Sequence, residues 1–119
     1  MNLLETDFNS IILTSAKNCI EQETNALISL KECINDQFIK VVKLIFSIKG
    51  RVVITGIGKS AIVGQKIVAT LNSTGTPSLF MHAADAIHGD LGMVQNEDAV
   101  ICISKSGETP EIKVLIPLI

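Results

Sequence analysis

The sequence predicts an α/β fold, a three-layer sandwich in which a parallel sheet lies between helices and is preceded by two further helices. Three short apolar runs, at 51–55, 78–82 and 98–104, indicate strands. Helical patterns separate these runs, and strands that alternate with helices are typical of a parallel sheet. Such crossovers are almost always right-handed, which gives a three-layer α/β stack.

Composition excludes several classes of protein. Of the 119 residues, 47% are hydrophobic and 18% are charged, yet no uncharged run reaches the roughly 18 residues of a membrane-spanning helix. A net charge of −2 and an aromatic content of 3% argue against a nucleic-acid partner. Cys19, Cys33 and Cys102 have no CxxC spacing, and the chain starts without a secretory signal, so we expect a cytoplasmic protein with reduced thiols.

Residues 1–50 are predicted to form two helices that pack on a domain formed by 51–119. Apolar residues recur at helical spacing through 5–32, and the pair Asn35–Asp36 offers N-cap residues for a second helix that ends at Gly50. The last segment, KVLIPLI, is an apolar helical pattern without a cap. Natural domains rarely finish in this way, so we expect the domain to be the first part of a longer one.

The elements of the domain follow from local signals. β-Branched runs next to glycine indicate strands, apolar residues at helical spacing indicate helices, and glycine and proline mark their ends. In chain order the predicted elements are strand 51–55, helix 60–73, strand 78–82, a short helical turn or loop at 83–92, strand 98–104 and a final helix. Thr109 is predicted to cap that final helix, with Pro110 at its first position, where a missing N–H costs nothing.

A polar cluster follows each predicted strand. These clusters are TGIGKS after the first strand, HAADAIHGD after the second and SKSGETPE after the third. In an open α/β sheet, ligands bind in the crevice at the carboxyl ends of the strands. The sequence therefore predicts a ligand site that is built from these three loops.

The first cluster, TGIGKS, matches two phosphate-binding patterns incompletely. A P-loop is excluded because Val53 stands where its first glycine is needed. The G-x-G-x-x-A spacing that starts at Gly56 fits a dinucleotide fingerprint, but the second strand ends in His82 and not in an acidic residue, which argues against NAD. Two interpretations remain: a backbone that approaches a ligand with Lys59 as its cation, or a tight turn with a solvated lysine.

The third cluster, SKSGETPE, favours an anion site. Ser104, Ser106 and Thr109 supply three hydroxyl groups just before a helix, whose N-terminus has unpaired N–H groups and a partial positive charge. This exceeds what helix capping needs, so we predict that the loop binds phosphate. Glu111, in the first turn, either complements the helix dipole or acts as a general base.

The second cluster contains both histidines of the chain, His82 and His88. Their spacing is not that of a helical zinc pair, although Asp85 or Asp90 could complete a metal site in the loop. Contacts to sugar hydroxyls, acid–base work and a structural role are the alternatives, and the sequence leaves them open.

Four segments in order, GIGKS, STGTPS, HAADAIHGDLGMV and ISKSGET, resemble the sugar isomerase (SIS) domain and, within it, the arabinose-5-phosphate isomerases. The resemblance covers the whole chain and implies a flavodoxin-like topology of the Rossmann type, free of nucleotide. It implies an aldose–ketose isomerase that interconverts D-ribulose 5-phosphate and D-arabinose 5-phosphate through an enediol. Such enzymes feed 3-deoxy-D-manno-octulosonate synthesis for lipopolysaccharide or capsule.

The resemblance also implies roles for individual residues. Lys59, which would stabilise an enediolate oxygen, and Glu111, the candidate base, are implied to be catalytic together with His88. His82 matches a position where zinc binds as an inhibitor, and no cofactor is required. The family works as a homotetramer in which neighbouring subunits complete the sites. The implied substrate-binding residues are Gly75, Thr76, His82, His88, Ser104, Ser106 and Thr109.

Members of this family continue with two more strands, a further catalytic Glu and His, and often a pair of CBS modules. We therefore expect residues 1–119 alone to be inactive. Two rival interpretations stay open. One is a non-catalytic sugar-phosphate sensor, although no basic recognition helix precedes Arg51. The other is an isomerase for another sugar phosphate, against which the HGDLGM loop argues by resemblance.

Overall fold

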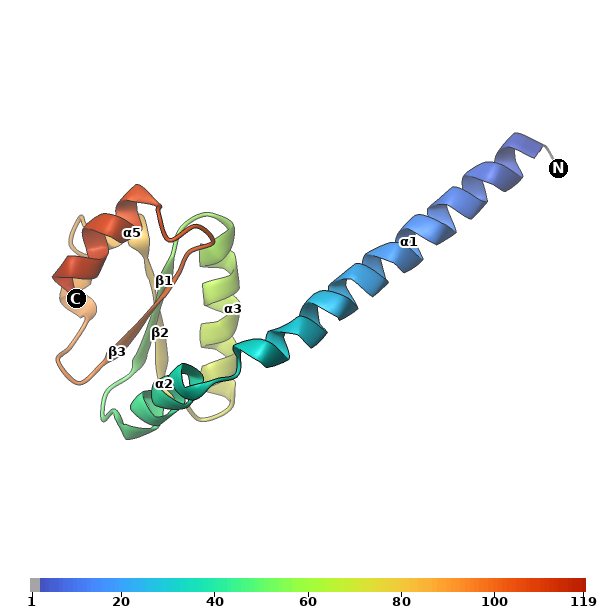
Figure 1. The fold of residues 1–119 in the computed structure, drawn as a ribbon. Coiled ribbons are helices and arrows are strands. Elements are labelled where there is room, and N and C mark those ends of the chain that lie inside the picture. The colour runs from blue at the N-terminus through green and yellow to red at the C-terminus, as the bar shows by residue number, and fades with distance from the viewer. Residues whose placement is uncertain (1–2) are drawn as a thin grey trace. The chain divides into compact units, whose positions relative to one another are not determined.

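The computed structural model describes residues 3–119 and divides the chain into two compact units, residues 1–41 and 42–119, which are treated separately below. Figure 1 shows the elements of both units. In residues 3–119, no helix combines the length and the apolar character that crossing a membrane requires.

The first helices form largely as predicted. The predicted helix over 5–32 is a long α-helix, α1 (Leu3–Ser29), followed by a 3-10 turn (Leu30–Cys33). The next helix, α2 (Asp36–Ser47), has Asn35 as its N-cap, because the Asn35 Oδ1 accepts the N–H of Gln37 at 2.9 Å. The helix ends before Gly50, so the predicted end lies a few residues too late.

A parallel three-stranded sheet forms the centre of residues 42–119. Its strands are β1 (Val52–Gly56), β2 (Ser78–His82) and β3 (Ala99–Ile103), in the order β2-β1-β3. Every residue of β1 is buried, as expected for the continuous β-branched run of a central strand. The predicted α/β class and parallel sheet are confirmed, and the strand order is that of the first three strands of flavodoxin-like folds.

Helices cover both faces of this sheet (Figure 1). The helix α3 (Lys59–Ser73) packs on β1 and β2, so closely that a Cβ on Gly64 would lie 3.0 Å from the Phe80 ring. The opposite face is covered by the short helices α4 (Ala83–Ala86) and α5 (Pro110–Leu115). The buried side chains of that second layer are Val53, Met81, Ala83, Ala86, Ile112 and Leu115.

Cys102 belongs to this core and not to a reactive site. It is half-buried on β3 and packs against the cluster of the second layer. Burial raises the pKa of the Cys102 thiol, which keeps the sulfur in its unreactive protonated form. Cys102 is thus a core residue.

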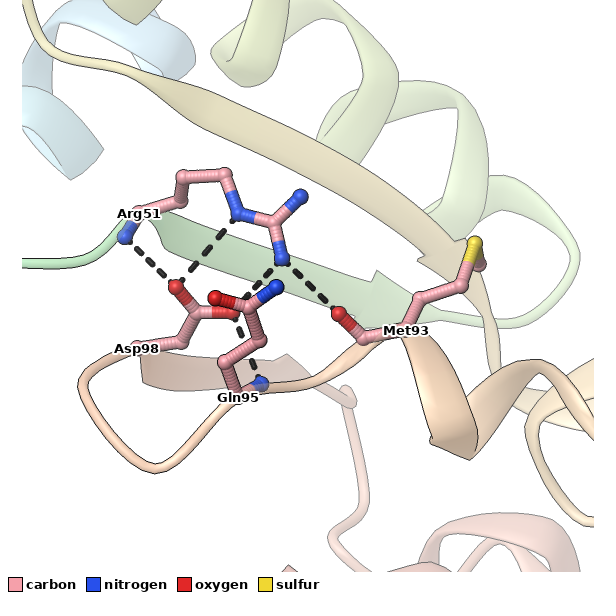
Figure 2. Close-up of polar contacts among 4 residues, drawn as sticks. All are labelled: Arg51, Met93, Gln95 and Asp98. Carbon is pink, nitrogen blue, oxygen red and sulfur yellow. Dashed lines mark hydrogen bonds and ion pairs between the residues drawn. The ribbon is translucent and has the colours of Figure 1, made fainter.

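An ion pair ties the starts of β1 and β3 together (Figure 2), and sequence reasoning did not predict it. The Arg51 Nη2 donates to Asp98 Oδ2 at 2.9 Å, and the Arg51 backbone N–H donates to Asp98 Oδ1 at 2.7 Å. The Gln95 backbone N–H adds a further bond to Asp98 Oδ2 at 3.0 Å. The side chain of Asp98 is 1% exposed and that of Arg51 is 36% exposed. These bonds lower the pKa of Asp98 from 3.8 to about 2, the Arg51 side chain contributing most.

Asp98→Asn is expected to destabilise the protein by roughly 1–2 kcal/mol at neutral pH, a value discounted because Arg51 is partly exposed. The pKa of Asp98 is depressed in the folded state, so its contribution to stability is present above about pH 4 and is lost as pH falls toward 2. The difference in urea midpoint between wild type and variant should therefore shrink between pH 7 and pH 3. Glu97→Gln, at the neighbouring exposed carboxylate, is the matched control. A difference of the same size at both pH values would contradict this account.

Candidate functional site

The carboxyl ends of the three strands lie side by side. The last residue of β1, Gly56, is in register with His82 on β2 and with Ile103 on β3. The three polar loops therefore leave one edge of the sheet from adjacent positions. The loop after β1 leads to α3 on one face, and the loop after β3 leads to α5 on the other face (Figure 1). Such a switch point between neighbouring parallel strands is where α/β sheets bind ligands.

The first loop is a tight turn that presents Lys59. A Cβ on Gly56 would lie 3.1 Å from the backbone carbon of Ser60 and 3.2 Å from the Ile103 oxygen, so only glycine lets the backbones approach this closely. Gly58 has a φ of 58°, which also favours glycine. Lys59 then begins α3, is exposed, and forms no ion pair with any residue that the structure describes. Its ammonium group is available to an anion at the strand ends.

The second loop places its two histidines differently. His82 ends β2, and its Nδ1 is buried without a hydrogen-bond partner, 3.8 Å from the Asp85 Oδ2. A buried nitrogen without a partner costs free energy, so this ring is suited to receive a ligand or water. His88 is exposed, and its backbone N–H donates to the backbone carbonyl oxygen of Asp85 at 2.9 Å.

The third loop is closed by its own hydroxyl groups. The Ser104 Oγ accepts the Gly107 N–H at 3.0 Å, and the Ser106 Oγ accepts the Glu108 N–H at 3.1 Å. Ser104 and Thr109 share a hydrogen bond of 3.2 Å between their hydroxyl groups. The bond between Ser104 and Thr109 uses one of their two hydroxyl protons, so the other proton of this pair and that of Ser106 are available to a ligand, and the loop holds these two O–H donors in fixed positions.

Thr109 is the N-cap of α5, and Pro110 follows at the first helical position, as predicted. The Thr109 hydroxyl makes no capping hydrogen bond to the helix. The Thr109 hydroxyl therefore does not act as an ordinary helix cap, and it forms a hydrogen bond with the Ser104 hydroxyl instead. This geometry indicates that the Thr109 hydroxyl stabilises the loop and not the helix.

Glu111 lies in the first turn of α5 and is half-buried. The neighbouring ion pair of this region joins Lys113 to Glu108. Glu111 takes part in no ion pair with the residues that are described, so its carboxylate is not neutralised inside this chain. A carboxylate at this edge can accept a proton from a ligand bound between the loops.

Gly75 and Thr76 lie at the opposite edge of the sheet from the three loops. They connect α3 to the start of β2, and the Thr76 N–H donates to the Leu71 oxygen at 2.9 Å. Both line an apolar hollow of about 430 Å³ together with Ile45 and Phe46. This hollow lies at the amino edge of the sheet, so the structure does not bring these two predicted substrate-binding residues to the three loops.

The metal prediction centred on His82 has limited support in the geometry. Within residues 3–119, as far as they are described, no group of three or more His, Cys, Asp and Glu side chains is arranged to hold a metal ion. His82 and Asp85 approach each other at 3.8 Å and provide two donors at most. A zinc ion here would need further ligands, so zinc at His82 stays a prediction.

Sequence reasoning missed Thr55 at this edge. It is the next-to-last residue of β1, is fully buried, and its Oγ1 has no hydrogen-bond partner. Across the sheet it is in register with Met81 and Cys102. The signal that could have found it is a hydroxyl residue that ends a run of Val and Ile directly before the first glycine of the loop.

Comparison with known proteins gives consistent findings. A family model described as SIS domain matches residues 44–119. The chain is 50% identical over 111 residues to arabinose 5-phosphate isomerase KdsD of Pseudomonas aeruginosa, covering 93% of this chain and 34% of that protein. It is 49% identical over 107 residues to arabinose 5-phosphate isomerase KpsF of Escherichia coli O6:H1, covering 89% of this chain and 33% of the relative. The chain thus spans about a third of the length of the curated relatives it matches.

A solved structure shares this fold over nearly the whole chain. The E. coli CFT073 protein c3406, in complex with arabinose 5-phosphate, superposes with a TM-score of 0.83 at 42% identity. The match covers 99% of this chain and 60% of that chain. The two proteins are therefore alike in sequence as well as in fold.

Proposed function

Because the chain belongs to the SIS domain family, we propose that it forms the phosphate-binding part of an isomerase that interconverts D-arabinose 5-phosphate and D-ribulose 5-phosphate. The relatives' names support this substrate over a heptose or hexulose phosphate and over a sugar-phosphate sensor. In the direction that forms arabinose 5-phosphate, the reaction would serve 3-deoxy-D-manno-octulosonate synthesis.

One observation carries the proposal. Three polar loops start from Gly56, His82 and Ile103, which are in register at one edge of the sheet. The loop after Ile103 presents three hydroxyl groups that are fixed by hydrogen bonds within the loop. A phosphate monoester offers three oxygens to such donors, and charge-assisted hydrogen bonds of this kind are strong. We assign the phosphate of the sugar to residues 104–109.

The chemistry assigned to the other loops is a proton transfer between adjacent carbons. Glu111 accepts the proton from C2 of the open-chain aldose, and a 1,2-enediol forms as the C1 carbonyl oxygen takes up a proton from His88, which later receives the proton of the C2 hydroxyl. The proton is then returned at C1 while the hydroxyl on C2 becomes the ketone, which gives ribulose 5-phosphate. Lys59 lies at the start of α3 and stabilises the negative oxygen of the enediolate. His88 contacts the sugar hydroxyls and assists their proton exchange.

The proposal extends to assembly and location. Along α1 of the single chain, large apolar side chains are exposed, among them Phe8, Ile11, Ile20 and Leu27. Exposed apolar surface of this kind fits burial against other copies, so we assign a homotetramer. Gly75 and Thr76 then act in the site of a neighbouring copy. A cytoplasmic location and a reaction without a required cofactor complete the proposal.

The phosphate role is tested by removing two hydroxyl groups from the full-length protein. Ser106→Ala combined with Thr109→Ala is expected to raise the Kd for arabinose 5-phosphate at least about tenfold, because two hydrogen bonds to a charged group are lost. Titration calorimetry measures the change. Ser73→Ala on α3, whose hydroxyl donates to the Thr70 oxygen, is the matched control.

Two further arms sharpen this test. Thr109→Ser keeps a hydroxyl group and should keep the affinity. D-arabinose, which has no phosphate, should bind wild type and double variant equally weakly. An unchanged Kd for arabinose 5-phosphate in the double variant would remove residues 104–109 as the phosphate site.

A further inference from the structure

The loop that carries His88 has two separate anchors. Residues 83–98 lead from β2 to β3, and the first anchor is α4, whose alanines Ala83 and Ala86 are buried in the core. Beyond Gly89 the hydrogen bonds are short turns, from the Gly92 N–H to the Gly89 oxygen at 3.0 Å and from the Val94 N–H to the Leu91 oxygen at 3.1 Å. Such turns shape the loop, and within it Leu91 and Val94 pack against the core.

The glycines of this segment give its backbone no side-chain contacts. Gly89 has a φ of 138°, and a Cβ built on Gly89 or on Gly92 would meet nothing within 4 Å. Glycine in open space loses more conformational entropy on ordering than any other residue. The apolar packing of Leu91 and Val94 is not directional, so a hydrogen bond to this end of the loop adds a polar anchor that fixes its position.

That anchor is the Arg51 guanidinium (Figure 2). Its Nη2 donates to the Met93 oxygen at 2.8 Å, and this is the hydrogen bond that joins residues 90–94 to the sheet among the residues that the structure describes. Arg51 itself is held by Asp98, whose carboxylate also accepts the Arg51 Nε at 3.4 Å. Asp98 is in turn held against the start of β1, where the Gly50 N–H donates to the Glu97 oxygen at 3.0 Å.

The forked guanidinium group of Arg51 is well suited to hold the loop and the sheet together. Its planar guanidinium donates to a carboxylate and to a carbonyl oxygen at once in a fixed geometry, whereas a lysine ammonium is a point charge on a flexible stem. Pairing of Arg51 with Asp98 alone would need no contact with Met93. The additional bond to Met93 connects the sheet to the loop and points to a role beyond joining β1 and β3.

We propose that Arg51 is a positioning residue which, held by Asp98, fixes the far end of the 83–98 loop through the Met93 oxygen and thereby places His88 at the substrate. The inference rests on the function proposed above, in which His88 contacts the sugar. Arg51 lies at the start of β1, at the opposite end of the strand from Gly56, so it acts through the loop and not by touching the substrate.

A double-mutant cycle in the full-length protein tests this connection. Arg51→Met, which keeps the side-chain stem but no donor, is expected to lower kcat/KM for arabinose 5-phosphate about tenfold, mainly by raising KM. In a His88→Ala background the same change should have less than about a twofold effect, because the group it positions is already gone. Equal losses in both backgrounds would show that Arg51 does not act through His88. Lys49→Met, at an exposed neighbouring cation, is the matched control.

Amide hydrogen exchange gives a second readout that does not depend on turnover. In Arg51→Met, residues 86–95 should exchange faster than in wild type, while α3 stays protected. Arg51→Lys should likewise accelerate exchange in this loop, because the ammonium does not reproduce the fork. Equal acceleration in β1, α3 and the loop would mean that Arg51 stabilises the whole domain, and would overturn the proposal. If wild type does not convert arabinose 5-phosphate, the proposed function fails, whereas the exchange pattern still decides whether Arg51 holds the loop.

Discussion

Lys59→Ala in the full-length protein is expected to lower kcat for the interconversion of arabinose 5-phosphate and ribulose 5-phosphate by about 10²–10³-fold. Lys59 is exposed at the first residue of α3, directly after the turn at Gly58. In the reaction proposed, negative charge develops on an enediolate oxygen at this position, and removing one preorganised donor typically costs a factor of this size. The measurement is steady-state turnover, with the Kd for the substrate determined in parallel.

The control for this prediction comes from the same helix. Lys66→Ala removes an exposed lysine from α3, two turns after Lys59, and should leave kcat within about twofold of wild type. If the Lys59→Ala variant has the same kcat as Lys66→Ala, Lys59 is a solvated surface lysine without a catalytic role. A variant that binds substrate poorly but keeps its kcat would make Lys59 a phosphate contact.

Glu111→Gln is expected to lower kcat by about 10²–10⁴-fold and to change substrate affinity little. The amide keeps the size of the side chain but cannot accept the proton from the substrate carbon. Hydrogen exchange between solvent and C2 of arabinose 5-phosphate, followed by NMR in heavy water, reports this step directly. Glu97→Gln is the matched control, since Glu97 is an exposed carboxylate just before β3, at the opposite end of that strand from the candidate site. Exchange at the wild-type rate in Glu111→Gln would exclude Glu111 as the base.

Much of the fold could be predicted because local patterns decide it. The predicted strand 78–82 is the observed β2, and the strands predicted at 51–55 and 98–104 differ from β1 and β3 by one residue at each end or less. β-Branched runs in a buried parallel sheet leave few alternative conformations. The predicted helix 60–73 begins one residue late, because Gly58 and not a side-chain cap starts it.

Contacts between distant residues could not be predicted in the same way. Arg51 and Asp98 are 47 residues apart, and nothing local to either one indicates its partner. The pairing follows from the register of β1 with β3, which only the folded sheet defines. Gly75 and Thr76 are a different case, because they directly precede the predicted strand 78–82 and a parallel sheet alone puts them at its amino edge; only the resemblance assigned them to the substrate.

Local sequence patterns were enough to predict which loops form the candidate site, but not the contacts within those loops. Because the carboxyl ends of parallel strands meet at one edge, the polar clusters after β1, β2 and β3 had to start from adjacent positions, as the register confirms. The internal bonds of the third loop, such as that between the Gly107 N–H and the Ser104 Oγ, depend on the turn at Gly107 and became visible only in the structure.

The most direct test of the central claim is a crystal structure of the full-length protein with arabinose 5-phosphate. Its phosphate is expected to lie against Ser104, Ser106 and Thr109, with the sugar carbons extending toward Lys59 and Glu111. A phosphate bound at the amino edge of the sheet, or a loop 104–109 that makes no contact with the ligand, would contradict the account.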